Sequence, residues 1–269
     1  MTEHLTKRWQ TLPATPAPLA SFKGQHAPIN GCSLYYTEGG TGDDVIIMLH
    51  GGMANSDYWG IQAAYLAKTH RVILVDSRGH GRSTLGDKPL SYAQMADDII
   101  HLMNHLEIPN ASLVGWSDGG VQSIILASEH PDRIKRIFAY GPHMSASGIN
   151  LACSGDKVVN AFVKRATEDY RELSPTPDKF DVFSKTLRGL WKWEHDAEFT
   201  EDRLNAIRCP AWVVGGDRDE MIHRAHLEYL VAHIPDSSYM ILPETSHFAF
   251  LQAPLLFNEA LADFLSVKA

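Results

Sequence analysis

The sequence predicts an α/β protein with a mostly parallel sheet flanked by helices. Short, β-rich runs of apolar residues alternate along the chain with helical patterns, which is typical of strand–helix–strand units. The runs are continuously apolar, as expected of strands that helices cover on both faces.

The predicted strands follow one another through most of the chain. The first, residues 33–38, ends at a Gly-Gly-Thr-Gly turn over residues 39–42. The next two are residues 45–49 and residues 72–75, the second of which is followed by Asp76. Four more strands are expected at residues 111–114, 134–140, 211–214 and 239–242.

Helix starts can be recognised between these strands. Ser91 and Gln94 are spaced as in a capping box, which predicts a helix start at this point. The apolar residues that follow at helical spacing are Met95, Ile99, Leu102, Met103 and Leu106. Pro254 is suited to the first position of a C-terminal amphipathic helix.

The strand–helix rhythm is interrupted once, which predicts three segments. Residues 1–25 form a Pro-rich N-terminal arm, and residues 26–142 together with 209–269 form the sheet domain. Residues 143–208 are helical in pattern, carry Trp191 and Trp193, and are predicted to form a helical lid. Insertions of this kind tend to cover pockets, so we expect the lid to influence substrate choice.

Composition excludes several classes of protein. The chain has 269 residues, of which 44% are hydrophobic and 21% are charged, as in an ordinary globular protein. Its net charge of −8 and the absence of a basic block argue against nucleic-acid binding. No apolar run is long enough for a membrane span.

The cysteines and the N-terminus suggest where the protein functions. Cys32, Cys153 and Cys209 are widely spaced and form no CxxC pair, so neither a disulfide framework nor a cysteine zinc site is predicted. We expect a cytoplasmic protein, because the N-terminus lacks the apolar segment of a secretory signal. We also expect it to be a monomer or a homodimer. The alternative is periplasmic export with a leader that has been removed.

A candidate nucleophile lies in the G-x-S-x-G pentapeptide of residues 115–119. The pentapeptide follows the strand predicted at residues 111–114 and precedes an apolar helix that starts at Gly120. In that setting a tight turn exposes the serine hydroxyl above the sheet, so Ser117 is the predicted nucleophile. The alternative is that Ser117 only caps the following helix.

A serine nucleophile needs a base within hydrogen-bond reach and an acid that orients the base. Asp219 lies just past the end of the strand predicted at residues 211–214 and is the preferred acid. Asp217 and Glu220 are its rivals, although Asp217 is also suited to shaping the turn. His247 is the only histidine after the last predicted strand and is the predicted base.

The loop after the strand at residues 45–49 reads His50-Gly51-Gly52-Met53. A loop in this place supplies one backbone N–H of an oxyanion hole, and the residue after the nucleophile supplies the other. Gly52 is the preferred first donor, with Met53 as the alternative, and Asp118 is the second donor. His50 is expected to stabilise its loop by hydrogen bonding.

The chain resembles the α/β-hydrolase superfamily in five pieces that occur in family order. The pieces are His50-Gly51-Gly52, the Asp76-to-Ser83 segment, Gly115-Trp116-Ser117-Asp118-Gly119-Gly120, Gly216-Asp217-Arg218-Asp219 and Ser246-His247-Phe248. The resemblance covers residues 26–269 and implies the fold and the Ser–Asp–His triad. It argues against dehalogenases and epoxide hydrolases, which have an aspartate nucleophile, but one fold hosts many chemistries.

The Gly-Trp-Ser-Asp-Gly-Gly turn is similar to that of valacyclovir hydrolase-like esterases, which act on amino-acid esters. This resemblance implies that the Asp118 carboxylate attracts a substrate ammonium group. The simpler interpretation, taken here as the default, is that the carboxylate stabilises the N-terminus of its own helix.

We therefore expect a serine hydrolase that cleaves small to medium carboxylic esters through an acyl-enzyme, without metal or organic cofactor. The predicted substrate-binding residues are Met53, Trp116, His143, Met144 and Trp191. The alternatives are a C–C bond hydrolase or lactonase with the same triad, and a ligand-sensing receptor with slow turnover. His101 and His105 are spaced as a metal pair, but they have no evident third ligand and are assigned to the helix surface.

Overall fold

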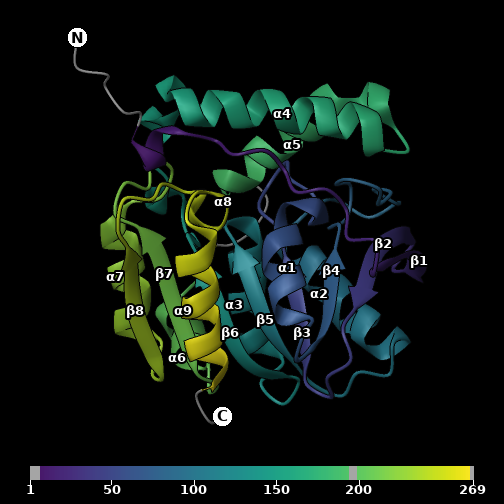
Figure 1. Cartoon of the computed structure of the whole chain (residues 1–269), viewed down its shortest axis with the longest axis horizontal. Helices are drawn as coiled ribbons and strands as arrows, with labels where there is room; N and C mark the ends of the chain where they lie inside the picture. The colour runs from purple at the N-terminus through teal and green to yellow at the C-terminus, as the bar shows by residue number, and fades with distance from the viewer. Residues whose placement is uncertain (1–6, 194–198, 267–269) are drawn as a thin grey trace.

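The computed structural model describes residues 7–193 and 199–266, and these residues form one eight-stranded sheet with helices around it (Figure 1). The strands are β1 (Lys23–Ile29), β2 (Cys32–Gly39), β3 (Val45–Leu49), β4 (Arg71–Val75), β5 (Ala111–Trp116), β6 (Ile134–Tyr140), β7 (Ala211–Gly216) and β8 (Ser237–Leu242). Their order in the sheet is β1-β2-β4-β3-β5-β6-β7-β8.

The pairing confirms the predicted mostly parallel sheet. β1 pairs antiparallel with β2, and β2 pairs antiparallel with β4, whereas every pairing from β4 through β8 is parallel. The carboxyl ends of β3, β5, β6, β7 and β8 therefore meet at one edge. Ligands bind outside this edge in open α/β sheets.

The helices are α1 (Gly60–Leu66), α2 (Tyr92–His105), α3 (Asp118–Glu129), α4 (Lys157–Leu173), α5 (Phe180–Trp191), α6 (Glu201–Asn205), α7 (Arg224–His233), α8 (Ala249–Gln252) and α9 (Pro254–Ser266). α2 starts where predicted, because the Ser91 hydroxyl accepts the Gln94 N–H at 3.1 Å. The reciprocal half of the capping box is replaced, since the Gln94 side-chain amide donates to Asp98 instead.

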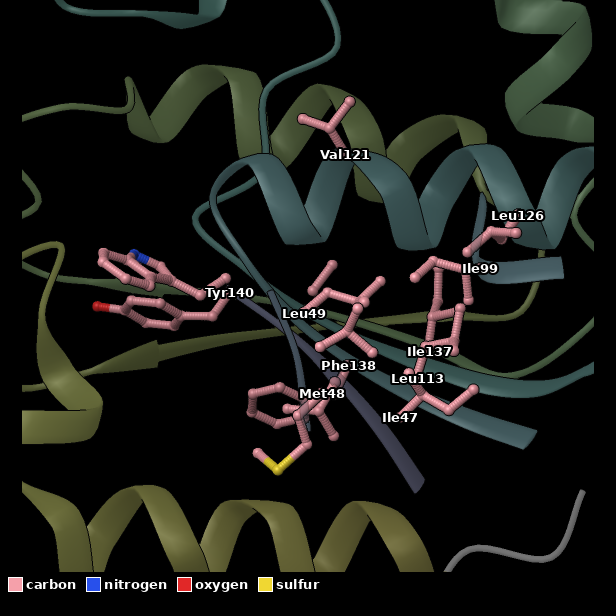
Figure 2. Packing of buried hydrophobic residues seen from close by; sticks show 14 of the residues in the cluster. Ile47, Met48, Leu49, Ile99, Leu113, Val121, Leu126, Ile137, Phe138 and Tyr140 are labelled. Atoms are coloured by element: carbon pink, nitrogen blue, oxygen red, sulfur yellow. The ribbon is translucent and has the colours of Figure 1, made fainter. Parts of the chain in front are cut away.

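The core lies on both faces of the central strands. Every residue of β3 and β5 is buried, which explains their unbroken apolar sequences. Figure 2 shows Ile47, Leu113 and Ile137 of three neighbouring strands gathered together, with Leu126 of α3 and Ile99 of α2 beside them. This packing makes the central strands a rigid base for the loops at their carboxyl ends.

Two features of the N-terminal half were not predicted. β1 begins at Lys23, ahead of the predicted boundary at residue 26, and α1 lies between β3 and β4. β1 is an edge strand whose first four residues are exposed, so it lacks the apolar run that marks the central strands. Residues 1–6 of the predicted arm lie outside the described residues.

The segment between β6 and β7 contains α4 and α5, which lie across one end of the sheet (Figure 1). α4 ends at Leu173, just before the Ser174-Pro175-Thr176-Pro177 stretch, and a 3-10 turn at Pro177–Lys179 precedes α5. Residues 194–198 of the predicted lid, and residues 267–269 of the predicted sheet domain, lie outside the described part. Within that part, no helix is long and apolar enough to cross a bilayer.

Candidate active site

Ser117 occupies a sharp turn between β5 and α3. Its φ of 54° lies in the left-handed region, which is strained for a residue other than glycine. The turn is closed on both sides, because a Cβ atom on Gly115 would lie 2.2 Å from the Gly119 carbonyl oxygen and one on Gly119 would lie 2.1 Å from that of Leu49. The Ser117 N–H donates to the Tyr140 carbonyl at 2.8 Å, which fixes the turn against β6.

His247 and Asp219 form a hydrogen-bonded pair in the loops after β8 and β7. His247 Nδ1 lies 2.9 Å from Asp219 Oδ2, and both side chains are buried. The other carboxylate oxygen of Asp219 accepts the N–H groups of Met221 and Ile222, each at 2.9 Å. These contacts fix the carboxylate so that it receives Nδ1–H, and the lone pair is then on Nε2 of the histidine.

His247 Nε2 is buried and has no hydrogen-bond partner within the described part of the chain. His247 and Ser117 line the same cavity. Burial lowers the pKa of His247, but the charge and the hydrogen bond of Asp219 together outweigh burial. The pKa of His247 is therefore above its ordinary value. A histidine with a basic Nε2 that shares a cavity with a serine hydroxyl is suited to accept its proton.

The two rival acids have other partners. Asp217 lies at the surface and accepts the Thr245 N–H at 3.2 Å, so it contacts the turn that leads to the histidine loop. Glu220 Oε2 accepts the backbone N–H of His247 at 3.1 Å and does not contact the ring nitrogen that Asp219 holds. Of the three acids, Asp219 is the one hydrogen-bonded to the imidazole.

The predicted oxyanion loop also lies at the cavity. Gly52 and Met53 both line it, and Met53 has a left-handed φ of 64°. A side chain at position 52 would run into the Asp118 carboxylate at 2.5 Å and the Trp191 ring at 2.9 Å, which explains the glycine. The backbone of Gly52 therefore passes close to the first residue of α3, as two cooperating N–H donors require.

The cavity has a volume of about 430 Å³ and an apolar lining with few polar groups. Its described lining residues are Gly52, Met53, Trp116, Ser117, Asp118, His143, Ile149, Leu151, Cys153, Ser154, Val159, Asn160, Phe162, Val163, Arg188, Trp191, Lys192, Met221, Ile222 and His247. A larger hollow of about 740 Å³ lies between residues 79–91 and α5, but none of the three triad candidates lines it.

The structure brings four of the five predicted substrate-binding residues to this cavity. Met53, Trp116, His143 and Trp191 line it. Met144 is not among the lining residues and packs in the hydrophobic core. The sequence suggested Met144 by its nearness to His143, but neighbouring residues of an irregular segment can point in different directions.

The Asp118 carboxylate is buried against two neutral donors. Trp191 Nε1–H lies 3.1 Å from each of its oxygens, and the Tyr92 hydroxyl donates to Oδ1 at 3.0 Å. Burial raises the pKa of Asp118 to about 6, although these hydrogen bonds oppose the shift. Within the described part of the chain no lysine or arginine forms an ion pair with this carboxylate. Among the described residues, this wall of the cavity therefore carries a buried acid that is not ion-paired to a lysine or arginine.

His143 extends the same network and is uncharged. Its Nε2 lies 3.1 Å from the Tyr92 hydroxyl, and its buried Nδ1 has no hydrogen-bond partner in the part of the chain that is described. Burial lowers the pKa of His143 to about 3, so the ring adds no positive charge beside Asp118 at neutral pH. Trp193 packs edge-on against this ring and does not line the cavity.

The remaining histidines with assigned roles lie elsewhere. His50 Nδ1 lies 2.8 Å from the Gly51 carbonyl, and its Nε2 accepts the Ser77 N–H at 3.0 Å, so the ring joins two loops at the sheet edge. His101 lies on the exposed side of α2 beside Asp97. The residues that the structure describes contain no group of three or more side chains arranged to hold a metal ion.

Sequence reasoning missed two parts of the site. Tyr92 follows the helix start predicted at Ser91, but nothing local in the sequence connects it to Asp118. The apolar residues of α4 at the cavity, Val159, Phe162 and Val163, were not singled out either. Their spacing of three and four residues was the available signal, since it predicts one face of a helix.

Comparisons with known proteins agree with this geometry. The profile of a family described as alpha/beta hydrolase fold matches residues 44–156. The human serine hydrolase BPHL is 28% identical over 250 residues, which cover 88% of this chain and 84% of the human protein. A putative carbamate hydrolase, RutD, from Caulobacter sp. (strain K31) is 29% identical over 86% of this chain and 94% of its own length.

A solved structure shows the same fold. The meta-cleavage product hydrolase from Pseudomonas fluorescens IP01 superimposes with a TM-score of 0.78 over 90% of this chain and 97% of that chain, at 18% identity. At this identity the likeness shows the fold alone.

Proposed function

The chain belongs to the α/β-hydrolase superfamily, and from this premise we propose that it is a serine hydrolase that cleaves small to medium carboxylic esters. The observation that supports the proposal most is the buried pair of His247 and Asp219, whose free ring nitrogen shares one cavity with the strained Ser117. Strained backbone conformations and buried titratable side chains are common at the catalytic sites of enzymes.

The proposed reaction has two stages. Ser117 Oγ attacks the ester carbonyl carbon while His247 Nε2 takes the hydroxyl proton, and the negative charge that forms on the carbonyl oxygen is bound by the N–H groups of Gly52 and Asp118. His247 then gives the proton to the alkoxide oxygen as the C–O bond breaks, which releases the alcohol and leaves an ester on Ser117. Asp219 holds the tautomer that both transfers need.

In the second stage, water takes the place of the alcohol. His247 removes a proton from the water as its oxygen attacks the acyl carbon, and the same N–H groups bind the charge again. When the bond to Ser117 breaks, His247 returns the proton to Oγ and the carboxylic acid leaves. The side chains that line the cavity supply every proton transfer, so no metal or organic cofactor takes part in this scheme.

The proposed lid, residues 143–208, contains α4 and α5. Val159, Phe162 and Val163 of α4 and Trp191 of α5 line the cavity, so these helices limit the size of the acyl or alcohol group. A volume of about 430 Å³ suits a small or medium ester. Within esters, Asp118 supports a preference for substrates with an amino group, because a buried carboxylate that no described lysine or arginine pairs with gains from a substrate cation.

A second candidate is hydrolysis of a C–C bond or a lactone with the same triad. It is favoured by the apolar cavity and by the names of similar proteins, which include 3-oxoadipate enol-lactonase 2 from Acinetobacter baylyi. The third candidate, a ligand-sensing receptor with slow turnover, has no specific observation in its favour.

Labelling with a fluorophosphonate tests the mechanism. We expect one adduct, which mass spectrometry locates on Ser117, and we expect Ser117→Ala to lower kcat by roughly 10³–10⁶-fold with an unchanged fold. An adduct on Ser83 or Ser246 would show that Ser117 is not the nucleophile. A panel of p-nitrophenyl esters, lactones and vinylogous diketones then separates ester hydrolysis from the second candidate.

A further inference from the structure

Glu220 lies beside the proposed acid and base, but the scheme above gives it no role. Its Oε2 accepts the backbone N–H of His247 at 3.1 Å, while the preceding residue, Asp219, binds the ring Nδ1 of the same histidine at 2.9 Å. Two carboxylates that are neighbours in the chain therefore contact one histidine. Glu220 contacts its main chain, and Asp219 contacts its ring.

The second oxygen of the Glu220 carboxylate, Oε1, is buried but has no hydrogen-bond partner in the described part of the chain. Asn150 fixes the main chain of this segment. Its Nδ2 donates to the Glu220 carbonyl at 3.0 Å, and its backbone N–H donates to the Met221 carbonyl at 2.8 Å. A buried carboxyl with one oxygen unsatisfied destabilises a fold, so stability does not explain it.

The charges of Glu220 and His247 influence each other. Burial, together with the charge of Asp219, raises the pKa of Glu220 to about 7, although the charge of His247 opposes the shift. The influence is mutual, because Glu220 is one of the groups that raise the pKa of His247. Within the described residues, the Cys153 thiol and the Tyr140 phenol also feel the charge of Glu220, and burial raises the pKa of both, so they stay uncharged at neutral pH. Asp118 is a further carboxyl that raises the pKa of His247.

We propose that Glu220 is a positioning residue that stabilises the protonated form of His247 while Ser117 reacts. The inference rests on the serine-hydrolase function proposed above. When His247 takes the serine proton, an imidazolium forms beside Asp219, and its positive charge favours the ionised form of Glu220. The Glu220 charge in turn lowers the free energy of the imidazolium, and no bond to Glu220 is made or broken.

The variant Glu220→Gln separates charge from shape. Glutamine keeps the side-chain length and an oxygen that accepts the His247 N–H, but it cannot ionise. We expect the acid limb of kcat/KM to move to lower pH by about half to one unit and the plateau to fall about three- to tenfold. Glu244→Gln is the matched control, because it removes the same charge from an exposed position in the same loop as His247.

A merely structural role predicts a different result. If Glu220 only holds the loop, Glu220→Gln leaves the acid limb where it is in the wild type and in Glu244→Gln, and this outcome would overturn the inference. Labelling of wild-type Ser117 by a fluorophosphonate, followed against pH, distinguishes the two proposals. No adduct on Ser117 would overturn the proposed function together with this inference, whereas normal labelling with an unmoved limb overturns this inference alone.

The wild-type protein provides a second measurement that does not depend on how the variant folds. With glutamate labelled by carbon-13 in its side-chain carboxyl, NMR should show one carboxyl that titrates near neutral pH, well above the ordinary value of about 4.3. If every glutamate carboxyl titrates below about pH 5.5, the titrations of Glu220 and His247 are not coupled and the inference fails.

Discussion

Replacement of Asp118 by asparagine removes a buried negative charge and keeps the side-chain size and the backbone N–H. In the folded protein, burial raises the pKa of Asp118 from its ordinary value of 3.8 to about 6. A difference of about two units costs about 3 kcal/mol of folding free energy once the carboxyl is ionised. This cost is already a net figure, because the folded-state pKa includes the favourable field of the α3 N-terminus on the carboxylate.

The sign of this effect depends on pH. Because the folded-state pKa is raised, the unfolded chain loses its proton first, and stability falls as the pH rises from 3.8 through about 6. Above that window the penalty is complete, and below it the penalty is absent. Asp118→Asn should therefore raise Tm by roughly 6–12 °C at pH 8 and have little effect at pH 3.5.

The same substitution tests substrate recognition. A contact between a desolvated carboxylate and an ammonium is worth about 1.5–3 kcal/mol, which is roughly 10- to 150-fold in kcat/KM. We expect Asp118→Asn to lose this factor on an aminoacyl ester and to keep the rate on the matching ester without the amino group. Equal losses on both esters, together with a lower Tm at pH 8, would refute the reasoning and leave Asp118 as a helix-stabilising residue.

Three further predictions concern the triad and metals. The value of kcat/KM should fall at low pH as His247 becomes protonated, with an apparent pKa above the ordinary value because Asp219 raises it, and His247→Ala should abolish activity. Asp219→Asn should lower kcat far more than Asp217→Asn, because Asp219 alone of the two contacts the imidazole; the reverse order would move the acid to Asp217. Prolonged EDTA treatment should leave the rate unchanged, whereas a loss that Zn²⁺ restores would assign His101 and His105 to a metal.

The nucleophile turn and the central strands could be predicted because their signals are local. Glycines around Ser117 are required by contacts within the turn and with β3, and a strand buried on both faces needs apolar residues at every position. The edge strand β1 has neither signal, since its first four residues are exposed and only its pairing with β2 makes it a strand. Its formation depends on a partner, which a local pattern does not record.

The surroundings of the site could not be predicted for a similar reason. Tyr92 and Trp191 reach Asp118 from α2 and α5, which come together only when the sheet has formed. The choice between helix stabilisation and substrate binding for Asp118 depends on these contacts. Likewise, the spacing of acids after β7 suggested Asp219 but gave no reason for a second buried carboxyl at Glu220.

The N-terminal arm connects the two walls of the cavity, and Figure 1 shows it running below α4 toward β1. Gln252 Nε2 donates to the Thr11 carbonyl at 2.8 Å, and Gln252 Oε1 accepts the N–H of Ser246, the residue before His247. On the other side, Arg165 of α4 donates to the Leu12 carbonyl at 3.0 Å and to that of Pro13 at 2.6 Å. The arm therefore joins the proposed lid to the loop that carries the base.

Arg165→Ala should release the arm from α4 while its contact with Gln252 remains. Two partly buried bonds from a guanidinium are lost, for which we expect about 1–3 kcal/mol of folding free energy. Limited proteolysis should then cleave the arm faster, and KM for esters should rise more than kcat falls, because α4 forms the cavity wall and not the triad. Lys164→Ala is the matched control, since it removes the same charge from an exposed position on the same helix. Equal cleavage rates in the two variants would mean that Arg165 does not hold the arm, and the lid would then be positioned by its apolar contacts alone.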